Sequence, residues 1–394
     1  MKTLKKVALS LIAVLLLGII AVTTAANAGA FAAPEQSGQA QALSVNAKSG
    51  LLMDYDTGTV VFEQNATDRM PIASMVKIMT LLITFEEIDA GNLTLDDDIV
   101  ASENATSMGG SQAFLDTGSS YKLGELIKSI VVGSANDSCV AVAEHICGDV
   151  SSFVARMNEK AALLGMENTN FVNCTGLPAP NQYCCARDVG VMTREMLSHK
   201  QFYDFSTIWM FDFAHPSGRV TQLSNTNKLI RAYEGCDGGK TGFTNEAMYC
   251  LSATAKRGNT RLISVVMGAQ TSKIRNGENA KLFNYGFANY ETRKIVEKGT
   301  VTETEFAVEK GKVKTVKGVA GDDFYSFVKK NAPKDVVLEE CVEKISAPVN
   351  AGDKIGVIKI LSNGTEIGEV DLLSEAASDK IGYLDILDDM IEKW

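Results

Sequence analysis

"MPIASMVKIM", residues 70–79, predicts the start of a helix that is apolar on nearly every side but carries one hydroxyl, Ser74, and one amine, Lys77. Residues three apart lie on the same helical face, so these two side chains can touch. A serine becomes an effective nucleophile when a base removes its proton. A lysine among apolar side chains is desolvated, which lowers its pKa and allows it to act as that base. We therefore interpret the pair as the nucleophile and base of an acyl-transfer reaction.

Two later motifs support this interpretation. The pattern Ser-x-x-Lys occurs by chance about once or twice in a chain of this size, and a surface lysine whose stem covers apolar neighbours would also produce it. However, Ser-Ala-Asn follows at 134–136, and Lys-Thr-Gly follows at 240–242. A Lys-Thr-Gly triplet alone is expected in about one chain in ten. The three motifs in this order are typical of penicillin-binding proteins and active-site serine β-lactamases.

The composition is that of an ordinary globular protein, with 394 residues, 45% of them hydrophobic and 22% charged. This length allows about two or three domains. The net charge of −10 argues against nucleic acid as a partner, because phosphate binding needs a basic face. The three histidines, His145, His199 and His215, are far apart in the sequence and match no ligand spacing. We expect no metal site and no cofactor.

Residues 1–28 have the features of a secretory signal peptide. Lys2, Lys5 and Lys6 precede an apolar run at 7–22, and small residues up to Ala28 offer a cleavage site. The alternative is an uncleaved membrane anchor, but a run of 16 residues is short for a membrane span. We therefore expect an exported protein that is secreted or peripheral on the outer face of the cytoplasmic membrane.

The first half of the remaining chain predicts a lead-in, then strands, then helices. Residues 29–46 are rich in Ala, Gln, Ser and Gly and predict a flexible segment. Residues 49–65 predict a β-hairpin that turns at 56–58. Amphipathic runs at 123–146 and 151–166 predict helices.

After about residue 200 the period changes. The segments at 247–255 and 260–269 alternate or run apolar, and they predict paired strands joined by a turn at 256–259. Residues 275–291 return to a helical pattern. We predict a catalytic domain over 47–296, which contains the strands and helices expected between 49 and 291.

A small β-rich domain is predicted at 297–375, where short alternating segments surround a hairpin turn at Asn363-Gly364. Residues 378–394 predict an amphipathic helix with one apolar face and an acidic polar face. This helix either contacts the membrane or packs on the β domain, and the sequence leaves both open. Its acidic face disfavours anionic lipid.

The sequence resembles the low-molecular-mass penicillin-binding proteins that are D-alanyl-D-alanine carboxypeptidases. The resemblance covers about 45–375, and it is clearest at 49–80, 109–148 and 260–275. It implies an α+β fold with a β-lactamase/transpeptidase-like catalytic domain, in which helices flank an antiparallel sheet beside a mainly helical subdomain. The small all-β domain that follows is the usual companion in this family.

The resemblance also implies roles for the motif residues. Ser74 would attack the penultimate D-alanine carbonyl of a peptidoglycan stem pentapeptide, with Lys77 as general base. Ser134, Asn136 and Lys240 would relay protons and hold the substrate, and β-lactams would be inhibitors. The substrate-binding group would include, besides Lys240, the residues Thr241, Gly242, Phe243 and Arg275. The backbone N–H groups of Ser74 and Phe243 would form the oxyanion hole. Lys273 lies two residues before Arg275 and is the alternative cation for this position.

Several of these residues have simpler interpretations. Ser134 and Asn136 are also good helix caps. Asp188 fits a helix cap or an ion-pair partner better than a catalyst, and His145 fits a helix surface. Cys139 is expected to pack behind the site. It is one of eight cysteines, whose even number permits disulfides in an exported protein without revealing the pairing.

Other functions remain as alternatives. A β-lactamase with these motifs usually carries Glu-x-x-Leu-Asn between the second and third motifs, and residues 137–239 contain no such sequence. A transpeptidase or endopeptidase of the same superfamily fits the motifs as well. A penicillin-binding sensor or a wall-binding scaffold is the non-enzymatic alternative, although every motif residue is intact.

Overall fold

The computed structural model describes residues 43–333, 335–383, 385 and 391. The predicted signal peptide at 1–28 and the lead-in up to residue 42 lie outside the described residues. No helix within the described residues has both the length and the apolar character that a membrane span requires.

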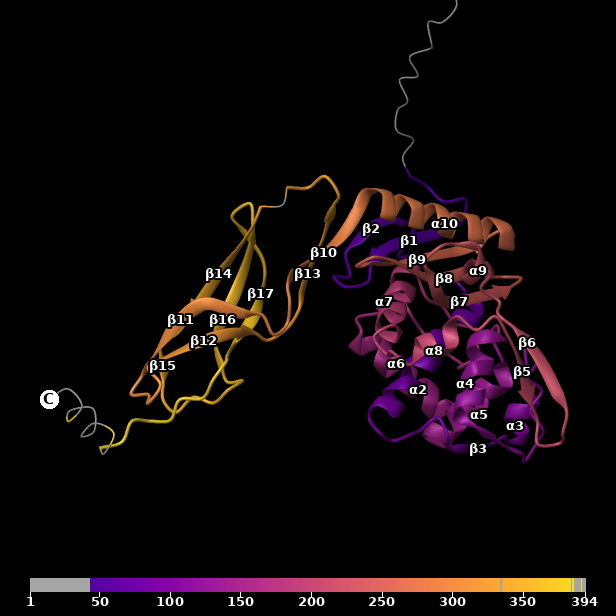
Figure 1. Ribbon diagram of the computed structural model, residues 1–394. Helices are drawn as coiled ribbons and strands as arrows, with labels where there is room; N and C mark the ends of the chain where they lie inside the picture. Colours follow the sequence, from indigo (N-terminus) through magenta and orange to yellow (C-terminus); the bar gives the residue numbers. More distant parts are fainter. Residues whose placement is uncertain (1–42, 334, 384, 386–390, 392–394) are drawn as a thin grey trace, which may run out of the picture. The chain divides into compact units, whose positions relative to one another are not determined.

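A five-stranded antiparallel sheet with the strand order β2-β1-β9-β8-β7 organises the larger part of the structure (Figure 1). Its strands are β1 (Ser49–Asp54), β2 (Val60–Gln64), β7 (Cys236–Thr244), β8 (Met248–Arg257) and β9 (Thr260–Ala269). β1 and β2 form the hairpin that the sequence predicts, and β8 and β9 form the predicted strand pair. β7 is an edge strand, so one side of its backbone has no partner strand in the sheet.

Helices cover both faces of this sheet (Figure 1). On β8, Ser252 lies 2.8 Å from Thr193 of α7 (Ala186–Met196), whereas on β9 Ser264 donates a 2.8 Å bond to Asn279 of α10 (Ser272–Asn289). Ser252 pairs with Val265, the residue after Ser264. Because consecutive side chains of a strand point to opposite faces, α7 and α10 pack on opposite sides of the sheet.

The helical part is built around α2 (Lys77–Asp89), whose residues 77–85 are all buried. This helix contacts α5, α6 and α7. The remaining elements of this part are η1 (Ala73–Val76), β3 (Asp98–Val100), α3 (Glu103–Thr106), β4 (Ser120–Lys122), α4 (Leu123–Val132), α5 (Asn136–Cys147), α6 (Val150–Leu163), α8 (Phe202–Ser206), β5 (Met210–Ala214), β6 (Val220–Ser224) and α9 (Leu229–Ala232).

The C-terminal part consists of strands with a hydrophobic core of their own. β10 (Tyr290–Val296) pairs with β13 (Phe324–Lys329), so strands begin before the predicted boundary at 297. The other strands form a six-stranded sheet with the order β14-β16-β17-β12-β11-β15. They are β11 (Val301–Glu309), β12 (Thr315–Ala320), β14 (Val336–Val342), β15 (Ile345–Ser346), β16 (Lys354–Ser362) and β17 (Thr365–Ser374).

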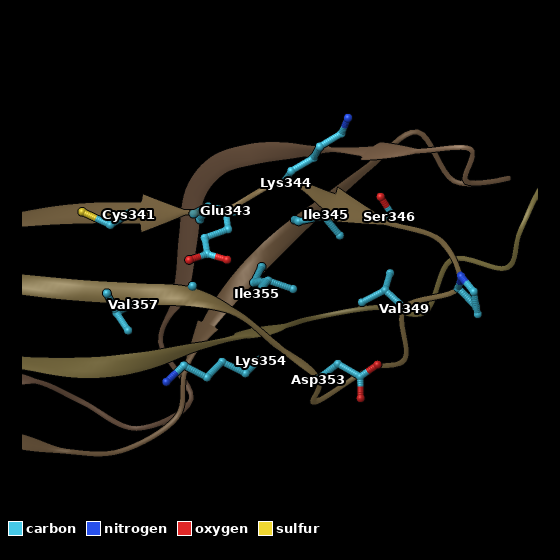
Figure 2. Close-up of a pocket in the computed structure, with 13 residues that line it drawn as sticks. Cys341, Glu343, Lys344, Ile345, Ser346, Val349, Asp353, Lys354, Ile355 and Val357 are labelled. Carbon is cyan, nitrogen blue, oxygen red and sulfur yellow. The ribbon is translucent and has the colours of Figure 1, made fainter.

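This part contains a predicted turn and a cavity. Asn363 and Gly364 both have positive φ, +50° and +76°, which confirms the predicted hairpin turn. A cavity of about 910 Å³ lies between the end of β14, β15 and the start of β16, where Ile345 and Ile355 are buried and Glu343 and Lys354 are exposed (Figure 2).

The C-terminal helix predicted at 378–394 does not start at 378. Ser378 forms a bridge with Val349, and Lys380 forms one with Gly311, so these residues are extended. At 378–380, backbone pairing with Val349 and Gly311 of the C-terminal part takes the place of the predicted helix. Of the remaining residues of the predicted helix, 384, 386–390 and 392–394 lie outside the described part of the chain.

Candidate active site

The predicted nucleophile lies on a turn in front of a helix. Ser74 belongs to the single 3-10 turn η1, and α2 begins only at Lys77, where we predicted one continuous helix. The difference arises at Ala73, whose left-handed φ of +47° cannot continue an α-helix. The Oγ of Ser74 nevertheless lies 3.1 Å from Nζ of Lys77, so the predicted contact is present.

The amine of Lys77 is fully buried and has two further neutral partners. Its Nζ lies 2.6 Å from Oδ1 of Asn136 and 2.6 Å from the carbonyl oxygen of Thr175. The amide nitrogen of Asn136 donates to the carbonyl of Gly109 at 2.6 Å, which turns its oxygen toward Lys77. Both partners of Lys77 are therefore hydrogen-bond acceptors.

The three contacts of Nζ fit both protonation states of Lys77, and burial favours the neutral one. Burial lowers the pKa of Lys77, and it outweighs Cys139, Cys174 and Asp137, which act in the opposite direction. A neutral amine has two hydrogens and one lone pair. In the charged state Nζ donates its third hydrogen to Oγ of Ser74. In the neutral state Asn136 and Thr175 can take both hydrogens, and the lone pair can accept the proton of Ser74.

The second motif lies at a break between two helices. We predicted one amphipathic run at 123–146, but Ser134 has a left-handed φ of +62° and separates α4 from α5. The N-cap of α5 is Ala135, and no side chain caps this helix. The capping interpretation of Ser134 and Asn136 is therefore wrong. Instead, Ser134 faces Lys240 of the third motif, and Asn136 faces Lys77.

The third motif lies on the edge strand β7. Lys240 is buried, and its Nζ donates to Oγ of Ser134 at 2.8 Å and to the carbonyl of Thr241 at 3.2 Å. Burial, together with the positive charges of Lys77 and Arg275, holds the pKa of Lys240 well below its usual value. The hydrogen bond between Lys240 and Ser134 joins the second and third motifs.

The residues after Lys240 bring β7 close to the nucleophile. A Cβ atom on Gly242 would lie 2.7 Å from the carbonyl oxygen of Ile72, so only glycine allows this approach to η1. The hydroxyl of Thr241 donates to Thr226 at 2.7 Å. The ring of Phe243 is half exposed and packs on Tyr249, with ring centroids 4.4 Å apart.

Arg275 and Lys273 differ in their surroundings. Arg275 lies in the first turn of α10 and is buried, whereas Lys273 is exposed. Burial lowers the pKa of Arg275. Its only side-chain hydrogen bond among the described residues goes from Nε to Asn276 at 3.1 Å. Its charge is close enough to lower the pKa of Lys240, although no hydrogen bond joins the two.

Sequence reasoning missed several residues that hold the site together. Thr175 contributes a backbone carbonyl to Lys77, and Gly176 lies against Ala73. The buried carboxylate of Asp137 accepts backbone N–H groups from the loop at 113–115. Backbone groups carry no residue-type signal, so Thr175 was not detectable. Asp137 directly follows the Ser-Ala-Asn motif, and that position was the one available clue.

The simpler interpretations fare differently. His145 is exposed on α5, as predicted, and Cys139 is buried close enough to Lys77 and Lys240 for their charges to act on its thiol. Asp188 is not the N-cap of α7, which is Cys185, and it forms no ion pair within the described part of the chain. Its carboxylate instead accepts hydrogen bonds from the loop that ends at Thr169, at 2.8 Å. All eight cysteines are free. Within the described residues no group of three His, Cys, Asp or Glu side chains is placed to hold a metal ion.

Comparison with known proteins identifies the family. Residues 35–271 match the family model described as D-alanyl-D-alanine carboxypeptidase. The chain belongs to this family. Residues 290–380 match a second model, described as the C-terminal domain of penicillin-binding protein 5. The D-alanyl-D-alanine carboxypeptidase DacF of Bacillus subtilis is 37% identical over 387 residues, which are 98% of each chain.

Solved structures show the same relationship. Penicillin-binding protein 5 of Haemophilus influenzae is 32% identical, with a TM-score of 0.71 over 86% of this chain and 99% of that one. A variant of the DD-transpeptidase of Streptomyces K15 is 27% identical, with a TM-score of 0.59 over 62% of this chain and 99% of that one. These findings confirm the predicted α+β fold with an all-β C-terminal part, and the predicted class of enzyme, a serine-type carboxypeptidase of the penicillin-binding group.

Proposed function

We propose that this carboxypeptidase removes the terminal D-alanine from peptidoglycan stem pentapeptides through an acyl-enzyme on Ser74. The arrangement around Lys77 carries the proposal. Its Nζ contacts Asn136, Thr175 and, at 3.1 Å, the hydroxyl of Ser74, so a neutral Lys77 has acceptors for its two hydrogens and a lone pair for the Ser74 proton. A buried lysine of lowered pKa is a suitable general base at neutral pH.

Acylation then follows from the positions of these groups. Lys77 takes the proton from Ser74, and Oγ attacks the penultimate D-alanine carbonyl. The backbone N–H groups of Ser74 and Phe243 stabilise the resulting oxyanion. The bond to the terminal residue breaks, and its amine takes up the proton that left Ser74, passed on from Lys77 along Ser134 and Lys240, so that Lys77 is neutral again. Free D-alanine leaves, and water hydrolyses the ester on Ser74 to restore the enzyme.

The third motif suits a substrate that ends in a carboxylate. Lys240 and Arg275 are buried basic side chains, and the charge of Arg275 is near enough to lower the pKa of Lys240. Among the described residues, neither has a carboxylate as a hydrogen-bond partner. Charge-assisted hydrogen bonds to a carboxylate would offset the cost of burying them. Thr241 adds a hydroxyl next to Lys240. The free edge of β7 can accept the peptide backbone as an additional strand.

The decisive experiment measures D-alanine release from a pentapeptide that ends in D-Ala-D-Ala, for the wild-type enzyme and for Ser74→Ala. We expect release by the wild type and none by the variant. A fluorescent penicillin should label the wild type and not Ser74→Ala, because a β-lactam forms the same ester on the same hydroxyl. An intact enzyme that takes up penicillin but releases no D-alanine would contradict the proposal.

Transpeptidation is a second candidate, because the chain resembles the Streptomyces K15 DD-transpeptidase over almost all of that structure. The two reactions share acylation and differ in whether water or an amine attacks the ester. Adding an acceptor amine such as glycylglycine to the same assay separates them. We expect hydrolysis to dominate. A product that is mainly the aminolysed peptide would make the transpeptidase the better assignment.

We further propose that the enzyme is exported through residues 1–28 and acts outside the cytoplasm, where peptidoglycan is found. The domain limits that accompany this proposal are 47–296 for the catalytic domain and 297–375 for the β domain. The segment 378–394 is proposed to make peripheral contact with the outer face of the cytoplasmic membrane. Co-sedimentation of the chain with and without residues 384–394 on lipid vesicles tests the contact.

A further inference from the structure

A loop at 109–115 forms one border of the site. The carbonyl of Gly109 accepts a 2.6 Å bond from the side chain of Asn136, and the carbonyl of Ser111 accepts a 2.7 Å bond from its backbone N–H. A Cβ atom on Gly110 would lie 2.8 Å from the same side-chain nitrogen. The loop therefore packs directly against a residue that contacts Lys77.

The buried carboxylate of Asp137 holds the next residues of this loop. It is 1% exposed and accepts backbone N–H groups from Ala113 at 3.0 Å, Phe114 at 2.7 Å and Leu115 at 3.1 Å. On the other side, the guanidinium of Arg219 donates to the carbonyl of Phe114. Both backbone groups of Phe114 are thus fixed by charged side chains.

Phe114 itself is held in an unusual state. Its φ is +65°, in the left-handed region that side chains other than glycine rarely occupy. Ala113 and Leu115 are buried, but the ring of Phe114 is 53% exposed. The strain is therefore not compensated by burial of the ring in the core. Strained residues of this kind concentrate at sites that bind ligands.

We propose that Phe114 is a specificity-determining residue, whose ring contacts the long aliphatic side chain of the acyl donor at the residue before D-Ala-D-Ala. This inference rests on the proposed function. The carboxylate end of the substrate belongs at Lys240 on β7, so the acyl part extends away from it. The loop at 109–115 contacts Asn136. Asn136 follows Ser134, the residue that faces Lys240 from the side opposite β7. The acyl part of the substrate would therefore extend toward this loop.

The test crosses an enzyme variant with a substrate variant. We compare kcat/KM for a pentapeptide with lysine at its third position and for the same peptide with alanine there. In the wild type we expect the lysine peptide to be preferred by about tenfold, the typical effect of an aliphatic contact. In Phe114→Ala the preference should fall close to one. Phe114→Leu, which keeps an apolar side chain, should recover most of the preference.

Leu163→Ala is the matched control, because it removes a highly exposed apolar side chain from α6, an element that supplies no site residue. It should keep the wild-type preference. All variants should keep their melting temperature and their rate of penicillin labelling, since penicillin lacks the third residue. A preference that survives in Phe114→Ala, or a wild type without preference, overturns the inference. A wild type that releases D-alanine from neither peptide overturns the proposed function, and this inference with it.

Discussion

A Cβ atom placed on Gly176 would lie 2.0 Å from the carbonyl oxygen of Ala73, the residue before the nucleophile Ser74. Gly176 has a φ of +84°, and it directly follows Thr175, whose carbonyl accepts from Lys77. One dipeptide therefore restrains both the turn that carries the nucleophile and the amine of the base. Preorganisation of this kind matters, because small displacements of reacting groups are costly to catalysis.

We expect Gly176→Ala to lose penicillin acylation by about 100-fold or more, since the added methyl group must displace the backbone in front of Ser74. Gly148→Ala is the matched control. It has the same φ of +84°, but a Cβ atom there would meet nothing within 4 Å. The control should lose only about 1 kcal/mol of unfolding free energy, the cost of the left-handed conformation, and acylate normally. Equal acylation by the two variants would show that the contact does not restrain the nucleophile.

The predictable parts of this structure are those that short stretches of sequence determine. The β1–β2 hairpin, the β8–β9 pair and the turn at Asn363-Gly364 each follow from local periodicity and turn residues. The contact between Ser74 and Lys77 survives even though Ser74 lies on a 3-10 turn and α2 begins only at Lys77, because a spacing of three residues keeps the side chains together in either form.

The unpredicted parts depend on contacts between distant segments. Thr175 acts through its carbonyl, which every residue has, and it meets Lys77 across 98 residues of sequence. The break at Ser134 interrupts a pattern that is helical on both sides, and it forms because Ser134 reaches Lys240 on β7. Ser378 leaves its predicted helix for the same kind of reason, since Val349 offers it a strand partner. Tertiary pairing overrides local preference in each case.

Asp137 is expected to act as a positioning residue for acylation. Asp137→Asn replaces a charged acceptor of three backbone N–H groups, and the loop that borders Asn136 should loosen. We expect the penicillin acylation rate to fall about tenfold, alongside a loss of about 1–3 kcal/mol in unfolding free energy. Stopped-flow acylation and denaturant unfolding measure the two effects.

The matched control is Asp188→Asn. Asp188 is also a buried carboxylate in the first turn of a helix, and it also accepts hydrogen bonds from a neighbouring loop. It should lose a similar unfolding free energy with little change in acylation. If both variants slow acylation to the same extent, the effect of Asp137 is general destabilisation.

Arg275 is expected to recognise the terminal carboxylate of the substrate. Arg275→Ala should raise KM about 10- to 100-fold for a peptide ending in free D-Ala-D-Ala, the range for a lost charge-assisted hydrogen bond. It should affect the same peptide with a C-terminal amide much less. Arg275→Lys, which keeps the charge, separates this effect from misfolding. Lys273→Ala removes an exposed cation from the same turn and should leave both values unchanged. Equal losses on acid and amide peptides would exclude a role in carboxylate recognition.

The pH dependence of acylation should report the protonation of Lys77. Because burial lowers the pKa of Lys77 below its usual value of 10.5, its neutral fraction rises as the pH increases through that lowered pKa. At saturating penicillin the acylation rate should therefore increase about tenfold per pH unit below the pKa and level off above it. Lys77→Arg should lose activity by about 10⁴-fold at every pH, since the guanidinium stays protonated. A wild-type rate that falls as the pH rises from 5 to 9 would contradict Lys77 as the general base.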